Sequence, residues 1–138
     1  MGRVVLANAI SPSMFLSRPN ESVWIVMRQV TVTEASKLAV MADDCAIGHP
    51  GTVELVKKLF NVSIPCERKT IKLGVGDELL IITLNFRPPE GKVYSYDELL
   101  ELYSQGKISF YHVKVDSKAY YKGESRTVLI PTILVPKR

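Results

Sequence analysis

The segment from Glu78 to Phe86 (ELLIITLNF) constrains the fold of this chain most, because it is almost continuously apolar. A half-exposed strand alternates polar and apolar residues, whereas a strand buried on both faces does not. A turn sequence at residues 74–77 (GVGD) precedes the segment, and residues 87–91 (RPPEG) end it, since proline cannot donate to a ladder. The segment therefore predicts a central strand in a sheet covered on both sides.

The remaining pattern alternates short strands with helices. Two capping-box sequences, Thr31 with Glu34 and Ser95 with Glu98, predict helix starts, and Pro50 suits the first turn of a further amphipathic helix reaching Phe60. Further strands are predicted at residues 3–9 (RVVLANA), 23–30 (VWIVMRQV), 68–73 (RKTIKL) and 108–115 (ISFYHVKV). Together they predict an α/β fold, a central mixed β-sheet flanked by helices in a single domain.

Composition sets loose limits on function. The formal charge of +4 permits an anionic ligand, but lysine and arginine are spread along the chain and form no arm for nucleic acid. No apolar stretch approaches the roughly 20 residues of a membrane span, so we expect a soluble protein of the cytoplasm. Cys45 and Cys66 have no metal-ligand spacing and suggest no disulfide framework, so we expect two half-buried thiols in a reducing compartment.

Few residues stand out as chemical groups. His49 follows a glycine and opens a predicted helix, where free N–H groups suit a phosphate, although a simple cap or turn has the same appearance. His112 lies within a predicted strand and is expected to be a packed or surface strand residue. Arg87 and Glu90 follow the buried strand, either as functional groups on a loop or as an ordinary surface pair. The sequence has no metal-binding, phosphate-loop or hydrolase-elbow motif.

Several motifs follow one another in a fixed order: residues 5–11 (VLANAIS), 46–49 (AIGH), 52–56 (TVELV), 76–78 (GDE), Arg87 with residues 90–92 (EGK), and 102–110 (LYSQGKISF). Together they resemble the viral ring nucleases, proteins of mobile elements that act against type III CRISPR immunity. The resemblance covers about residues 3–115 and leaves residues 117–138, beyond a domain of residues 1–116, as an extension without an assigned role. Its apolar end, residues 127–135, would be an additional strand or an arm that docks on a partner.

The resemblance implies a homodimer that encloses one cyclic tetra-adenylate and cleaves it to linear di-adenylates without a metal or other cofactor. Neither a membrane nor duplex nucleic acid is an expected partner. By position, His49, Arg87 and Glu90 match the catalytic residues of the family, with His49 as the general acid and Glu90 as the group that orients it. The residues implied as ligand contacts are Asn8, Ser11, Gly48, Arg68 and Thr83.

Two departures from the family pattern affect these assignments. Thr83 stands where family members often have glutamine, and Pro50-Gly51 replaces the more usual Asp-Ser after the histidine. Two other functions stay open on the sequence. One is a module that sequesters a cyclic nucleotide without cutting it, and the other is a small regulator that binds nucleic acid.

Overall fold

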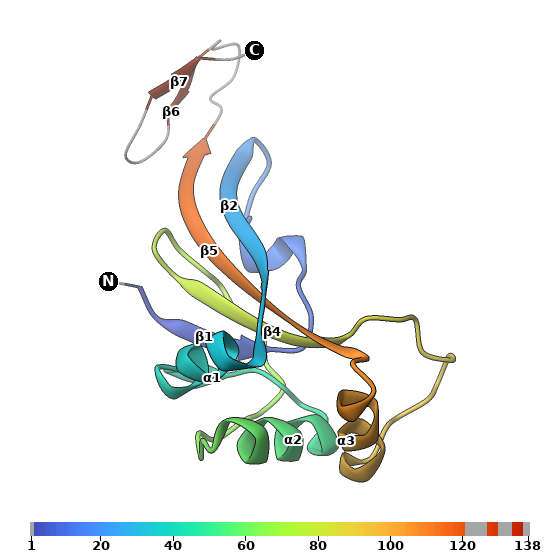
Figure 1. Ribbon diagram of the computed structural model, residues 1–138. Helices are drawn as coiled ribbons and strands as arrows, with labels where there is room; N and C mark the ends of the chain where they lie inside the picture. Colours follow the sequence, from blue (N-terminus) through green and yellow to red (C-terminus); the bar gives the residue numbers. More distant parts are fainter. Residues whose placement is uncertain (1, 121–126, 130–133, 137–138) are drawn as a thin grey trace.

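The computed structural model describes residues 2–120, 127–129 and 134–136, and Figure 1 shows the arrangement of its elements. The helices are α1 (Val32–Val40), α2 (Pro50–Phe60) and α3 (Tyr96–Ser104), with a short 3-10 helix at Pro12–Met14. The strands are β1 (Val4–Ala7), β2 (Glu21–Val30), β3 (Asp44–Cys45), β4 (Glu78–Leu84), β5 (Ile108–Tyr120), β6 (Thr127–Leu129) and β7 (Leu134–Pro136).

The strands form one mixed sheet, whose central order is β3-β1-β4-β5-β2. Strand β1 pairs in parallel with both β3 and β4, whereas β5 runs antiparallel to β4 and to β2. The β2–β5 register shifts at a bulge between Trp24 and Ile25. The α/β class, the mixed sheet and the single domain are thus confirmed.

Two apolar clusters lie on opposite faces of the sheet, as the composition of β4 predicts. Leu80 and Ile82 pack into the cluster that contains residues of α1, α2 and α3. Leu79 and Ile81 pack into the other cluster, with Phe15 beside the 3-10 helix. The helices therefore cover one face only, and irregular chain covers the other (Figure 1).

The helix starts follow the sequence signals. Both capping boxes form, at Thr31 with Glu34 and at Ser95 with Glu98, and each satisfies backbone N–H groups that a helix end leaves free. Helix α2 starts at Pro50, as predicted.

The predicted strand at residues 68–73 is wrong. This stretch carries no strand in the structure, although Ile71 and Leu73 are buried and alternate with exposed Lys72. Buried and exposed side chains do alternate here, but no neighbouring strand forms backbone hydrogen bonds with this stretch. Instead, the N–H of Leu73 donates to the carbonyl oxygen of Met14 at 2.7 Å. Burial on one face alone thus produced a strand-like pattern in irregular chain.

Strand β5 continues past residue 116, the expected end of the domain, to Tyr120. Tyr120 pairs with Leu129 of β6, which pairs in turn with β7. The apolar run at 127–135 thus contributes two short strands, while residues 130–133 lie outside the described part of the chain.

Candidate functional site

The candidate site lies at the carboxyl ends of the three parallel strands. Asn8 directly follows β1, His49 comes four residues after β3, and Thr83 stands at the end of β4. Because the parallel strands run the same way, their carboxyl ends meet at one edge of the sheet, the usual place for ligands in such folds. The topology therefore collects three side chains that are far apart in sequence.

These three side chains line one cavity of about 250 Å³. Its walls are largely apolar or aromatic, from residues of α2, β4, β5, α3 and the loop between β4 and α3: Leu55, Ile82, Leu84, Phe86, Pro88, Val93, Tyr94, Leu99 and Ile108. The polar groups in the lining are Asn8, His49, Thr52, Thr83 and Lys92. An apolar pocket with a few convergent polar groups is typical of a small-molecule site.

The N-terminus of α2 differs electrostatically from those of α1 and α3. His49 occupies its N-cap position but makes no capping hydrogen bond with its side chain, and the first turn has no acidic residue. The capping boxes of the other two helices instead supply Glu34 and Glu98. Helix α2 therefore has unoccupied N–H groups and an uncompensated positive dipole end beside the cavity, which suits an anion.

Two glycines allow close approach around His49. A methyl group on Gly51 would lie 2.6 Å from the carbonyl oxygen of Tyr94, so α2 packs directly against the start of α3. A methyl group on Gly48 would lie 2.6 Å from the Cβ of Arg68. Glycine at position 51, one of the departures from the family pattern, thus has a packing reason.

The other predicted ligand residues lie outside the lining of this cavity. Arg68 is exposed and lies against Gly48, at the side of the loop of residues 46–49, which we call the His49 loop. Ser11 is exposed, and its hydroxyl shares a hydrogen bond of 3.1 Å with that of Ser13. The structure thus brings Arg68 next to the histidine loop but does not bring Ser11 into the cavity.

Arg87 and Glu90 are exposed on the loop between β4 and α3. Among the described residues they form no ion pair with each other, and Glu90 makes no hydrogen bond to His49. Their loop neighbours Phe86 and Lys92 line the cavity. Both charged groups therefore lie on a segment that borders the cavity, with their side chains available to a ligand.

Two polar residues of the lining, Thr52 and Lys92, and the aromatic Tyr94 were not predicted as site residues from the sequence. Lys92 is held by an ion pair of 2.8 Å with Glu98, and this hydrogen bond raises the pKa of the Lys92 ammonium. Thr52 could have been found from its place in the first turn of α2, and the other two from their loop, which also carries Arg87 and Glu90.

His112 has a different role. Its Nε2 lies 2.7 Å from Oε1 of Glu78 within the sheet, and it is not part of the cavity lining. Across residues 2–120 and the two short C-terminal strands, no group of three His, Cys, Asp or Glu residues is placed to hold a metal ion. Over the same residues, no helix has the length and apolar character needed to cross a membrane.

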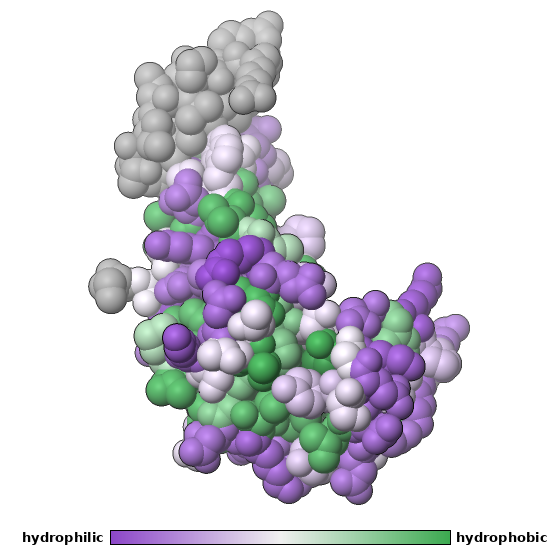
Figure 2. All heavy atoms as spheres, viewed as in Figure 1, coloured by the Kyte–Doolittle hydropathy of each residue, from purple (hydrophilic) through white to green (hydrophobic). Residues whose placement is uncertain are grey.

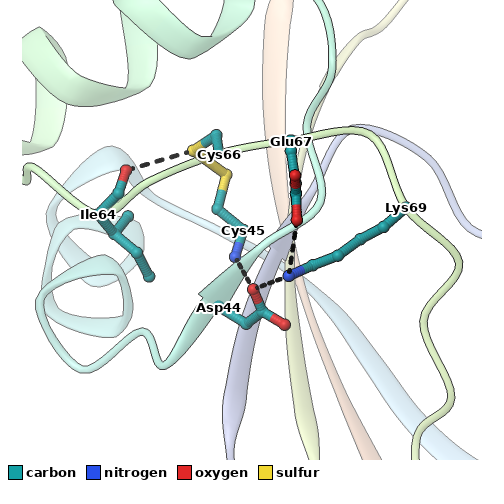
Figure 3. Close-up of a disulfide and its surroundings, with 6 residues drawn as sticks. All are labelled: Asp44, Cys45, Ile64, Cys66, Glu67 and Lys69. Atoms are coloured by element: carbon teal, nitrogen blue, oxygen red, sulfur yellow. Dashed lines mark hydrogen bonds and ion pairs between the residues drawn. A yellow bond between two sulfur atoms is a disulfide. The ribbon is translucent and has the colours of Figure 1, made fainter.

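The expectation of two unpaired thiols is wrong, because Cys45 and Cys66 form a disulfide (Figure 3). Strand β3 ends at Cys45, and the chain after α2 returns past it, so the two Cα atoms come within 4.6 Å. A separation of 21 residues gave no local sign of this pairing. The bond lies between the His49 loop and the segment that carries Arg68.

A family model described as STIV B116-like matches residues 4–111. The chain belongs to the STIV B116-like family. The structure of B116 of Sulfolobus turreted icosahedral virus is similar to it, with a TM-score of 0.62 and 36% identity over 82% of this chain and 99% of B116.

Two further viral proteins are similar to this chain. An uncharacterized protein, ORF116 of Acidianus filamentous virus 1, is 30% identical over 112 residues, which is 81% of this chain and 95% of the relative. Uncharacterized protein 26 of a Sulfolobus islandicus filamentous virus is 36% identical over 61% of this chain and 72% of its own length. The family is thus one of small proteins of archaeal viruses.

Proposed function

We propose that this protein is a metal-independent ring nuclease that binds cyclic tetra-adenylate and cleaves it to linear di-adenylates. The observation that carries the proposal is the convergence of Asn8, His49 and Thr83 on one cavity at the uncapped start of α2. These are three of the residues that the family resemblance implies as site residues. The cavity combines apolar walls for a base with an anion-binding helix end for a phosphate.

The size of the cavity favours a site shared between two chains. At about 250 Å³ it is smaller than the roughly 300–1,000 Å³ of pockets that bury a drug-sized ligand. A ring of four nucleotides exceeds it, so each chain would hold only part of the ring. In a two-fold dimer, each chain of formal charge +4 would face two of the four phosphates of the ring.

The exposed edge of the sheet supports a homodimer. Strand β2 pairs with β5 on one side and exposes four consecutive apolar residues, Trp24, Ile25, Val26 and Met27, between 36% and 56%. Figure 2 shows hydrophobic atoms among hydrophilic ones over the part of the surface where β2 runs. Monomeric proteins seldom leave a long apolar edge strand uncovered, because it invites pairing with another chain.

The proposed reaction needs no external nucleophile. A ribose 2′-hydroxyl, held in line, attacks the adjacent phosphorus, so a bond from the 2′-oxygen to phosphorus forms and the bond to the 5′-oxygen breaks. Protonated His49 donates a proton to the leaving 5′-oxygen, while solvent takes the proton of the 2′-hydroxyl. Arg87, with Arg68, would neutralise charge on the phosphorane. The first products carry 2′,3′-cyclic phosphates, which water can open.

The central test is cleavage of cyclic tetra-adenylate in excess EDTA. Wild type should yield di-adenylates, and His49→Ala should be slower by roughly 100- to 10,000-fold, the range for loss of a general acid. His112→Gln is the matched control, because His112 lies outside the cavity lining, and it should cleave at nearly the wild-type rate. Equal rates in wild type and His49→Ala would remove the assigned role. Tight binding without turnover would support a sequestering protein instead.

Glu90 gives a second test of the proposed mechanism. In the structure it makes no hydrogen bond to His49. If Glu90 orients His49 once the ligand is bound, Glu90→Gln should lower the cleavage rate while the Kd for cyclic tetra-adenylate stays within about threefold, because a catalytic contact can tighten only in the complex. An unchanged rate would exclude this role for Glu90.

Cleavage of this ring would remove the messenger that activates type III CRISPR effectors. The viral origin of the relatives supports an anti-CRISPR role in the cytoplasm of the host. The readout in cells is protection of a type III-sensitive virus by the wild-type gene and its loss with His49→Ala.

A further inference from the structure

We propose that the Cys45–Cys66 disulfide is a positioning element of the candidate site, which holds Arg68 against the His49 loop and thereby sets ligand affinity. The proposal rests on the proposed function in one respect, that Arg68 contacts the ligand. It also predicts a property of the chain alone, the mobility of the segment around Arg68, which can be measured without any ligand.

The segment that carries Arg68 has little structure of its own. Residues 62–73 contain neither helix nor strand, and Arg68 itself is exposed. Near Arg68, one backbone hydrogen bond holds the chain, from the N–H of Glu67 to the carbonyl oxygen of Cys45 at 3.2 Å. Segments with so few backbone hydrogen bonds open readily, so a covalent link matters more here than in a helix.

The disulfide joins this segment to the site over a very short path. Cys66 lies two residues before Arg68, and Cys45 lies four residues before His49. The Cβ of Arg68 lies so close to Gly48 that a methyl group there would come within 2.6 Å of it. The bond therefore fixes the start of the Arg68 side chain relative to the loop that carries the proposed general acid.

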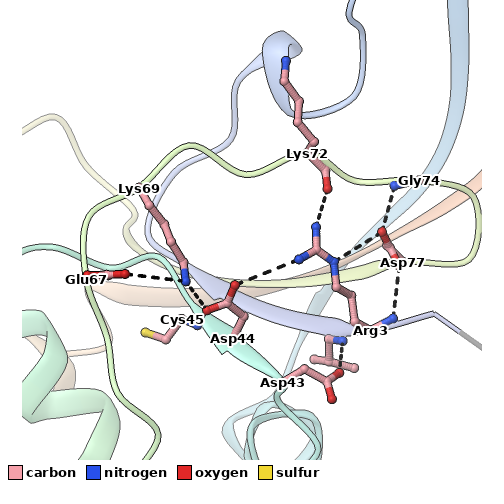
Figure 4. Close-up of polar contacts among 10 residues, drawn as sticks. Arg3, Asp43, Asp44, Cys45, Glu67, Lys69, Lys72, Gly74 and Asp77 are labelled. Carbon is pink, nitrogen blue, oxygen red and sulfur yellow. Dashed lines mark hydrogen bonds and ion pairs between the residues drawn. The ribbon is translucent and has the colours of Figure 1, made fainter.

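Apart from the disulfide, Val62 and Ile64 pack against the core on the helix side, and polar contacts anchor the part after Arg68 (Figure 4). The guanidinium of Arg3 donates to the carbonyl oxygen of Lys72, and Lys72 Nζ donates to the carbonyl oxygen of Ser13 at 2.7 Å. Closer to Arg68, Lys69 Nζ pairs with Asp44 Oδ1 at 2.5 Å, with 35% and 27% of the two side chains exposed. Partly exposed pairs contribute little, so this contact alone would hold the segment weakly.

A reductant would reach the bond from the side of Cys66. Cys66 is half-buried and lines a hollow with Asp43, Asp44, Ile64, Pro65, Glu67 and Lys69, whereas Cys45 is fully buried. A thiolate of a dithiol reductant would attack Cys66 Sγ and displace the Cys45 thiolate. In sum, the sulfur–sulfur bond breaks, both cysteines become thiols, and the dithiol, which supplies two electrons and two protons, becomes a disulfide.

The test is a cycle of four affinities in a His49→Ala background, where turnover does not remove the ligand. Cyclic tetra-adenylate is titrated against oxidised and reduced protein, each with Arg68 or with Arg68→Ala. A charge-assisted hydrogen bond is worth roughly 10- to 100-fold in affinity, so Arg68→Ala should weaken binding by that factor. Reduction should weaken binding several-fold when Arg68 is present and leave it unchanged in Arg68→Ala.

The outcomes separate positioning from simple stabilisation. The variant Cys45→Ala/Cys66→Ala, with or without reductant, should match reduced wild type, which excludes an effect of the reductant on other groups. An equal loss on reduction with and without Arg68 would overturn the proposal, as would no loss at all. Absence of binding to the oxidised protein would instead contradict the proposed function.

If cyclic tetra-adenylate does not bind, hydrogen–deuterium exchange of the protein alone still tests the proposal. Reduction should speed amide exchange at residues 66–70 by at least tenfold while β4 stays protected; unchanged exchange at 66–70 would overturn it. If the reduced chain unfolds, the oxidised protein offers a further measurement. A ligand that prefers the oxidised form must shift the thiol–disulfide equilibrium with the dithiol toward the Cys45–Cys66 disulfide, because the coupling is reciprocal. The same oxidised fraction with and without saturating ligand, at one fixed ratio of reduced to oxidised dithiol, would contradict the proposal.

Discussion

At the scale of single residues, the site depends on a close approach of backbones. The first turn of α2 touches the residues that lead into α3, and only glycine at position 51 leaves room for this contact. The position of His49 is coupled to the packing of these two helix starts, since it immediately precedes that turn.

Gly51→Ala should therefore lower the free energy of unfolding by about 1–3 kcal/mol, the usual cost of forcing an extra carbon into packed chain. Gly74→Ala is the matched control, because the nearest atom to a methyl group there is 3.8 Å away. Urea unfolding of the two variants checks the prediction, and equal stability of both would contradict the role of the contact.

Asp44 links stability to pH. The hydrogen bond from the Lys69 ammonium lowers the pKa of the Asp44 carboxyl below its ordinary value of 3.8. Because the folded pKa is the lower one, this contribution is complete above the ordinary value and is lost as the pH falls through the folded pKa. Wild type should thus lose stability below about pH 4 partly through Asp44.

Asp44→Asn removes this titration, so its urea midpoint should fall less than that of wild type between pH 6 and pH 3 at low salt. Asp116→Asn, a change of the same kind at an exposed residue of β5, should follow the wild-type pH dependence. If Asp44→Asn also follows the wild-type curve, the ion pair makes no measurable contribution.

At the scale of elements, β2 is the strand most exposed to association. Val26 is 56% exposed in its centre, and a lysine there would place a charge in an interface formed by this edge. Val26→Lys should convert the proposed dimer to monomer in light scattering at micromolar concentration. Val40→Lys, on α1 with 70% of the valine exposed, introduces the same charge elsewhere and should stay dimeric. A dimeric Val26→Lys protein would exclude this edge as the interface.

At the scale of the whole molecule, the sequence predicts what local patterns determine. The run in β4, the two capping boxes and the start of α2 at Pro50 depend on neighbouring residues and are confirmed. The strand expected at 68–73 failed because alternation reports burial on one face and not hydrogen bonding to a neighbour. The disulfide depends on chain that returns from 21 residues away, for which the sequence has no local sign.

The features of the candidate site also differ in whether local sequence predicts them. His49 could be placed at a helix start from its neighbours alone, but its meeting with Asn8 and Thr83 follows from the parallel pairing of three strands. The family resemblance implies all three as site residues, which no local pattern in the sequence does.

The bulge in β2 lies beside Trp24, the only tryptophan of the chain, with 37% of its surface exposed. The protein thus carries an intrinsic optical probe on the edge proposed to meet a second copy. A solvent-exposed indole fluoresces at longer wavelength than a buried one. The fluorescence maximum of Trp24 should therefore shift to shorter wavelength as the protein concentration rises through the dimer dissociation constant. Wild-type protein would then report its own assembly in a dilution series, with no label and no substitution.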